Sequence, residues 1–166
     1  MRAGKQKIGV RHRSLGFTYL SLLLIVAAMG VGFAAFGELA SNAAKREKEL
    51  ELIFVGDAYR QAIGQYYEGS PGGHKRYPKS LEQLLKDERF AFNRRYLRRL
   101  YRDPVTGKDW ATVEAPEGGI MGVRSASEAS PSKSANFPVG YEAFEGAARY
   151  ADWQFVYTPT AAVASK

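Results

Sequence analysis

Few side chains in this sequence could carry out covalent chemistry. The 166 residues contain no cysteine and two histidines, which excludes a disulfide framework, a cysteine-ligated metal and a thiol nucleophile. His74 stands in a glycine-rich stretch beside Lys75 and Arg76, and no serine or lysine lies in a nucleophile-elbow or phosphate-loop motif. We therefore expect neither an enzyme nor a resident cofactor.

Arginines form the densest charge cluster of the chain, between residues 89 and 102. The candidate basic patch consists of Arg94, Arg95, Arg98, Arg99 and Arg102. Aromatic residues stand between them, and cations interleaved with aromatic rings suit single-stranded nucleic acids. Arginine stems also cover apolar surface and pair with the acids of a neighbouring helix or subunit. We favour this second interpretation and do not expect nucleic acid as a partner.

The excess of basic residues is concentrated at the N-terminus. The chain has 24 basic and 17 acidic side chains, for a net charge of +7. Five basic residues precede the first acidic one: Arg2, Lys5, Lys7, Arg11 and Arg13. Without them the rest of the chain carries a net charge of only +2. The basic character therefore belongs to a leader and not to a nucleic-acid-binding domain.

An uncharged, mostly apolar run follows the basic leader and extends from residue 15 to residue 37. As a helix this run would be about 35 Å long, against a hydrocarbon core of about 30 Å. It is longer than the apolar region of a secretory signal peptide, and the basic residues before it favour a cytoplasmic N-terminus. We predict a single-pass membrane anchor at residues 17–37, in contact with lipid.

The stretch 38–68 predicts a continuation of the same helix. It lacks proline and is rich in alanine, lysine, glutamate and leucine, which are good helix formers. Apolar residues recur at steps of three and four and define one stripe: Leu52, Val55, Tyr59, Ala62 and Tyr66. The glycine-rich residues 69–73 should end the helix. The stripe should pack under a globular head, while the part of the helix nearer the N-terminus is left for lipid or for other copies.

Residues 69–157 predict a small α+β head. Ser80 followed by Gln83 matches a capping box, which indicates a short helix, and residues 93–102 favour another. Three further segments have the composition of short strands: 110–114, 120–124 and 153–157. Residues 116–119 would join the first two as an antiparallel hairpin. The predicted fold is a long N-terminal helix packed on a head of short helices and a small antiparallel sheet.

The N-terminal residues resemble the prepilin motif of type IV pilins and of the pseudopilins of type II secretion. The motif consists here of Gly16, Phe17, Thr18, Tyr19, Leu20 and Ser21. The resemblance implies that a prepilin peptidase cuts between Gly16 and Phe17, and that the new amino group of Phe17 is methylated. Residues 1–16 would then be a leader peptide, and 150 residues would remain in the mature chain.

Several segments of the head look like those of pseudopilins related to the major one. They are residues 77–82, 97–104, 119–123 and 152–155. The resemblance implies a pilin-like fold in which residues 38–68 are the periplasmic half of the helix. It also implies an inner-membrane protein with its head in the periplasm. Residues 158–166 are expected to follow the head as a flexible tail.

The resemblance implies the function of a pseudopilin subunit, which assembles through its N-terminal helix into a short periplasmic fibre that drives protein export. Its partners would be other pseudopilin subunits, a prepilin peptidase and the inner-membrane assembly platform. Small residues of the apolar run would permit close helix packing in such a fibre, namely Ala28, Gly30 and Gly32. In the second half of the helix, the packing residues would be Leu52, Val55 and Tyr59.

Two features depart from the family pattern. Ser21 occupies the fifth mature position, normally a glutamate whose carboxylate meets the amino group of a neighbouring subunit. A minor or initiating subunit is therefore at least as consistent with the sequence as a major one. Major pseudopilins resemble one another in a calcium loop, but here the acids near the C-terminal strands are widely spread. Asp103, Thr106 and Asp109 lie closer together but equally suit an ordinary turn, so we predict no metal site.

Two other functions stay open at the level of sequence. One is a type IV pilus subunit, including a minor one, for adhesion or DNA uptake. The other is a signal-anchored periplasmic binding domain that never polymerises. Removal of residues 1–16 by a prepilin peptidase would separate the two fibre-forming functions from this third one.

Overall fold

The computed structural model describes residues 15–159 of the chain, without the side chains of residues 15–18 and 30–40. It divides into two compact units, with the boundary in the sequence between Ala43 and Ala44. Most of the predicted leader and residues 160–166 of the predicted tail lie outside the described residues. All strands belong to the second unit.

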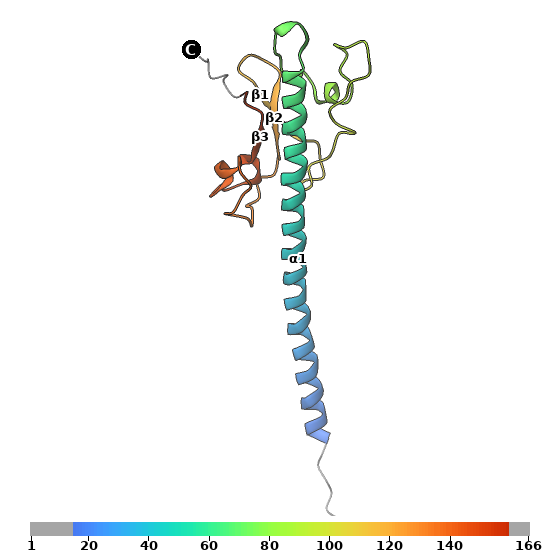
Figure 1. Ribbon diagram of the computed structural model, residues 1–166. Helices are drawn as coiled ribbons and strands as arrows, with labels where there is room; N and C mark the ends of the chain where they lie inside the picture. Colours follow the sequence, from blue (N-terminus) through green and yellow to red (C-terminus); the bar gives the residue numbers. More distant parts are fainter. Residues whose placement is uncertain (1–14, 160–166) are drawn as a thin grey trace, which may run out of the picture. The chain divides into compact units, whose positions relative to one another are not determined.

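One long helix, α1, extends from Leu15 to Glu68 and contributes residues to both units (Figure 1). Its 54 residues include no proline, so no backbone N–H is lost from the helical ladder. Among the residues whose side chains are described, no helix is sufficiently long and apolar to traverse a membrane.

The glycine-rich stretch ends α1, as the sequence predicted. The N–H of Gly69 still donates to the carbonyl of Gln65 at 2.9 Å, and the chain then enters a short 3-10 helix, η1 (Pro71–Gly73). Gly72 and Gly73 both have φ near +75°, a region that residues with a β-carbon rarely adopt. The chain therefore turns away from the helix within a few residues of Glu68.

Three short antiparallel strands form the sheet of the second unit, in the order β1 (Ala111–Glu114), β2 (Ile120–Arg124) and β3 (Gln154–Val156). β1 and β2 form a hairpin with Thr112 opposite Val123, and β3 pairs with β2 so that Phe155 also lies opposite Val123. The three predicted strands, the predicted hairpin and the α+β class are confirmed.

The core of the second unit lies between the sheet and the C-terminal part of α1, along which the strands lie in Figure 1. All five residues of the predicted stripe are buried, from Leu52 to Tyr66. Opposite them lie the fully buried rings of Trp153 and Phe155. A β-carbon at Gly56 would stand 2.4 Å from the Phe155 ring, so the helix and the sheet approach this closely only because residue 56 is glycine.

Short 3-10 helices replace regular helices in the rest of the head. They are η2 (Leu81–Leu84), η3 (Glu142–Phe144) and η4 (Tyr150–Asp152). η2 corresponds to the short helix predicted after Ser80. Its Gln83 accepts hydrogen bonds from the backbone of Lys79 at 2.8 Å and from the hydroxyl of Tyr66 at 3.1 Å, which ties η2 to α1.

The helix predicted at residues 93–102 is wrong, because this segment is irregular. Its backbone groups bond to a distant segment and not to one another. The N–H groups of Tyr96 and Leu97 both donate to the carbonyl of Leu84, and the carbonyl of Arg94 accepts from the N–H of Asp87. These tertiary bonds replace the i to i+4 ladder that the periodicity of the arginines suggested.

Candidate functional site

The prepilin-like motif lies at the start of α1. Gly16, Phe17 and Thr18 belong to the helix, but their side chains lie outside the described residues. Tyr19 and Leu20 are 65% and 60% exposed, and Ser21 is half-buried. The cleavage and methylation predicted at Gly16 and Phe17 stay predictions.

A continuous exposed apolar surface follows the motif in the first unit. Its large members are Leu22, Leu23, Leu24, Ile25, Val26 and Met29, each about half exposed or more. Ala28 is also exposed, whereas the surroundings of Gly30 and Gly32 lie outside the described residues. Contiguous apolar surface of this kind marks a site of contact with a membrane or with another protein.

The three packing residues predicted in the second half of α1 serve the head itself. Leu52, Val55 and Tyr59 are all buried in the core of the second unit. The Tyr59 hydroxyl donates to the carbonyl of Tyr101 at 3.0 Å and accepts from its N–H at 2.9 Å. Burial raises the pKa of this hydroxyl, which therefore stays protonated and holds the 97–103 segment against α1.

The predicted basic patch does not form one helical face. Arg94 is half-buried, with its guanidinium over the rings of Phe90 and Tyr96 at 4.9 and 5.4 Å. Arg99 lies over Tyr101 at 5.0 Å. The other three members, Arg95, Arg98 and Arg102, are exposed. The segment is irregular, so their spacing of four does not align them, and two of the five guanidinium groups stack on aromatic rings.

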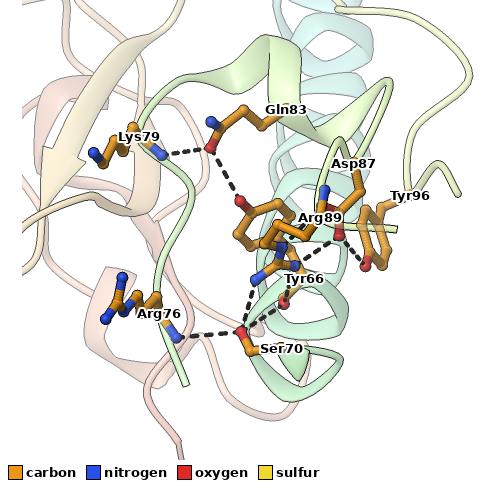
Figure 2. A network of polar contacts seen from close by, with 8 residues as sticks. All are labelled: Tyr66, Ser70, Arg76, Lys79, Gln83, Asp87, Arg89 and Tyr96. Atoms are coloured by element: carbon orange, nitrogen blue, oxygen red, sulfur yellow. Dashed lines mark hydrogen bonds and ion pairs between the residues drawn. The ribbon is translucent and has the colours of Figure 1, made fainter. Parts of the chain in front are cut away.

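The sequence analysis missed the role of Arg89, which lies at the centre of a polar network at the end of α1 (Figure 2). Its side chain donates to both carboxylate oxygens of Asp87 at 2.7 and 2.8 Å, to the Ser70 hydroxyl at 2.7 Å and to the Tyr66 carbonyl at 2.9 Å. The last four carbonyls of a helix lack intrahelical donors, and Arg89 satisfies one of them. The guanidinium also stacks over the Tyr66 ring at 3.5 Å.

Asp87 completes this network from a fully buried position. Burial alone would raise its pKa, but the hydrogen bonds from Arg89 and Tyr96 outweigh burial and lower the pKa below the usual aspartate value. The Tyr96 hydroxyl donates to Asp87 at 2.9 Å. The one available sequence signal was an acid two residues before an arginine, just after a short helix, which is too common a pattern to indicate a buried pair.

Two acidic residues of α1 form hydrogen bonds with the C-terminal part of the head. Glu49 is buried and accepts hydrogen bonds from the backbone of Ser132 and from the hydroxyl of Tyr150. About two turns later along α1, Asp57 accepts from the Tyr141 hydroxyl and from Arg60. The sequence analysis did not single out Glu49, because nothing near it in the sequence shows that a loop about 80 residues later covers it.

The carboxylate of Asp103 stabilises a turn by accepting hydrogen bonds. It accepts from the backbone of Val105 at 2.9 Å and from the hydroxyls of Thr106 and Ser125, both at 2.7 Å. These hydrogen bonds occupy both carboxylate oxygens of Asp103, one of the three residues that the sequence analysis considered for a calcium site. Over the part of the chain that the structure describes, no cluster of three or more acidic or histidine side chains could hold a metal ion.

No family model matches this chain, and searches among curated proteins and among solved structures also find no match.

Proposed function

We propose that this chain is a pseudopilin subunit of a type II secretion system. Residues 17–37 would hold it in the inner membrane until an assembly platform moves it into a short periplasmic fibre. The observation that carries the proposal is that α1 has two differently used parts. Its C-terminal part is covered by the head, whereas residues 22–29, directly after the prepilin-like motif, present large apolar side chains to solvent.

The exposed residues need an apolar environment that the head does not supply. Leu, Ile and Val each favour membrane insertion by about 0.3–0.6 kcal/mol at a helix centre. The same side chains can pack against other helices once the subunit leaves the lipid. A segment of this composition therefore suits both states of a pseudopilin, the membrane-stored subunit and the fibre subunit. Part of the proposed anchor, residues 30–37, lies outside the described side chains.

Ser21 sets the proposed subunit apart from the usual family pattern, because a minor or initiating subunit is at least as consistent with a serine at this position as a major one. A serine cannot offer the carboxylate that would pair with the amino group of a neighbouring subunit. A carboxylate would also cost about 2.5–3.5 kcal/mol in the membrane, so the serine favours membrane residence over directed assembly.

Intact-mass analysis tests the proposal. The full chain is expressed in the presence and absence of a prepilin peptidase. We expect peptidase-dependent loss of Met1 to Gly16 and the gain of one methyl group on Phe17. The matched control is Gly16→Leu, which should keep the leader because a bulky side chain occupies the cleavage site.

Two outcomes separate the alternatives. A chain that keeps its leader in peptidase-positive cells would be a signal-anchored domain, and the proposal would be wrong. A chain that is processed but enters fibres only with a type IV pilus machine, and not with a type II secretion platform, would be a pilus subunit.

A further inference from the structure

The head carries an open cleft of about 720 Å³ at the C-terminal end of α1. One wall is the segment between Gly73 and Lys79, and the opposite rim is the β1–β2 turn. The floor includes the rings of Tyr67 and Tyr77, whose centroids are 4.5 Å apart. We call this feature the basic cleft, because Lys75, Arg76 and Lys79 line it together with a single acid, Glu117.

The basic cleft is held open by bonds between its walls. The N–H of Ile120 donates to the carbonyl of Pro78 at 2.7 Å, and the Tyr77 hydroxyl donates to the carbonyl of Tyr157 at 3.1 Å. A β-carbon at Gly119 would stand 2.9 Å from Tyr77, so only glycine allows the turn to approach this segment so closely. The walls are therefore fixed without any ligand.

Two cations of the basic cleft lack a partner in the head. Lys75 forms an ion pair with Glu68. Among the described residues, the side chains of Arg76 and Lys79 form no hydrogen bond or ion pair, and both are exposed. Figure 2 shows them extending to the same side of the chain, away from the Arg89 network. They are available for an anionic partner.

A protruding loop with the complementary properties lies at the other end of the head. Val139 is 94% exposed at its tip, and Gly140 with φ near +92° makes the turn. Glu142 and Glu145 follow the tip in the chain and are exposed. They brace the loop by accepting from the backbone of Gly140 and Asn136 at 3.0 and 3.2 Å, and neither forms an ion pair within the described part of the chain. We call residues 136–145 the acidic loop.

The acidic loop is attached to α1 and to the Trp153 ring. The Tyr141 hydroxyl donates a hydrogen bond to Asp57 on α1, and the centroids of the Phe137 and Trp153 rings are 5.2 Å apart. The N–H of Gly140 lowers the pKa of Glu142 below the usual glutamate value. A preformed loop loses little conformational entropy when it binds.

The basic cleft and the acidic loop of one chain cannot meet each other. The loop is fixed to α1 at Asp57 and the cleft begins at Tyr67, about 15 Å further along the helix. A contact between the loop of one copy and the cleft of the next is heterologous, and repeated heterologous contacts build an open helical array unless the rotation closes a ring.

We propose that the acidic loop of one copy of this chain inserts into the basic cleft of the next copy. The apolar tip at Val139 covers the tyrosine floor, and Glu142 and Glu145 pair with Arg76 and Lys79. This inference rests on the proposed function, because it names the surface through which the heads of neighbouring fibre subunits recognise each other. Charge complementarity of this kind sets register and partner choice more than affinity.

Cysteine cross-linking tests the contact in the full chain. The protein contains no cysteine, so Lys79→Cys in one copy and Val139→Cys in another can be linked only where they meet. Both are expressed in cells with a prepilin peptidase and an assembly platform. We expect a dimer on oxidation. The matched control pair, Lys108→Cys with Val139→Cys, places an exposed cysteine outside the cleft and should give no dimer.

Charge reversal supplies a second, independent measurement. Arg76→Glu combined with Lys79→Glu should lower the amount of sedimented fibre by at least about tenfold, which corresponds to about 1.4 kcal/mol. Adding Glu142→Lys and Glu145→Lys to the same chain should restore part of the lost fibre, because the charges match again although lysine cannot accept the two backbone hydrogen bonds of the loop. All four positions are exposed, and an unchanged unfolding midpoint verifies that the variants are folded.

The outcomes separate this inference from the proposed function. If fibres form and the cysteine pair gives no more dimer than the control, or if charge reversal leaves the fibre unchanged, the loop and cleft do not form the contact although the pseudopilin function stands. If the leader is never removed and no fibre forms, both proposals are wrong.

Discussion

Arg89 is the side chain on which the local order at the end of α1 most depends. Its guanidinium joins the helix end, the Ser70 hydroxyl and the buried Asp87. A buried ion pair gains little net free energy over an apolar pair of the same shape, but removing one partner leaves a charge without compensation. The pair therefore acts mainly to set where the segment after η2 lies against α1.

Replacing Arg89 should destabilise the head. Arg89→Met leaves the buried carboxylate of Asp87 without its cation, and we expect the free energy of unfolding to fall by about 3–5 kcal/mol. Urea denaturation of the detergent-solubilised protein measures the change. Arg95→Met, at an exposed position, should stay within about 0.5 kcal/mol. Equal effects of the two substitutions would contradict the structural role of Arg89.

Acid should weaken the same network. The folded-state pKa of Asp87 is lowered, so its contribution is fully present above the unfolded value of about 3.9 and is lost as the pH falls through the lower folded value. The thermal midpoint of the wild type should therefore drop more steeply below about pH 4 than that of Asp87→Asn. Parallel pH profiles would show that Asp87 does not titrate with unfolding.

At the scale of the element, α1 owes its fit to the sheet to two glycines on its buried face. β-Carbons at Gly56 and Gly64 would stand 2.4 Å from the Phe155 ring and 2.7 Å from the Tyr157 ring. Glycine inside a helix normally costs about 1 kcal/mol relative to alanine. Here that cost is offset because large aromatic rings of the β3 region pack directly on the helix backbone.

Gly56→Ala should thus destabilise the protein, although alanine normally stabilises a helix relative to glycine. The added methyl group must displace the fully buried Phe155 ring, and overpacking of this kind costs about 1–3 kcal/mol. A lowered unfolding midpoint is expected in urea. Gln65→Ala, on the exposed face of the same helix, should be near neutral. A stabilised Gly56→Ala variant would mean that the sheet lies further from α1 than described.

At the scale of the whole molecule, the two units present opposite kinds of surface. The second unit buries its apolar residues between α1 and the sheet. The first unit presents apolar residues outward over 19–29. In the proposed function these residues enter lipid first and a fibre later, so this surface should govern where the protein is found.

A charge in the exposed apolar run should release the protein from membranes. Val26→Arg, at a residue 59% exposed, should lower insertion by about 2.5–3.5 kcal/mol at a helix centre. Carbonate extraction of membranes should then recover more protein in the soluble fraction. Phe92→Arg, at a residue 63% exposed in the head, is the matched control and should stay in the pellet. Equal retention of both variants would argue against the anchor.

The sequence alone was sufficient wherever a local rule decides the structure. A glycine-rich stretch ends α1, apolar residues at steps of three and four identify its buried stripe, and short β-branched and aromatic runs identify the three strands. The prepilin-like motif and the proposed anchor were also read from the sequence, and they stay predictions because they depend on residues and partners beyond the described chain.

Only the tertiary structure decided which polar groups are buried and what the irregular segments do. The arginine run has the spacing of a helix, yet its backbone bonds to residues 84–87 instead. Glu49 and Asp87 resemble ordinary surface acids until a loop distant in sequence or a neighbouring arginine covers them. The physical reason is that periodicity reports one element's own faces, whereas the burial of a charge and the joining of cleft walls depend on contacts between segments far apart in the chain.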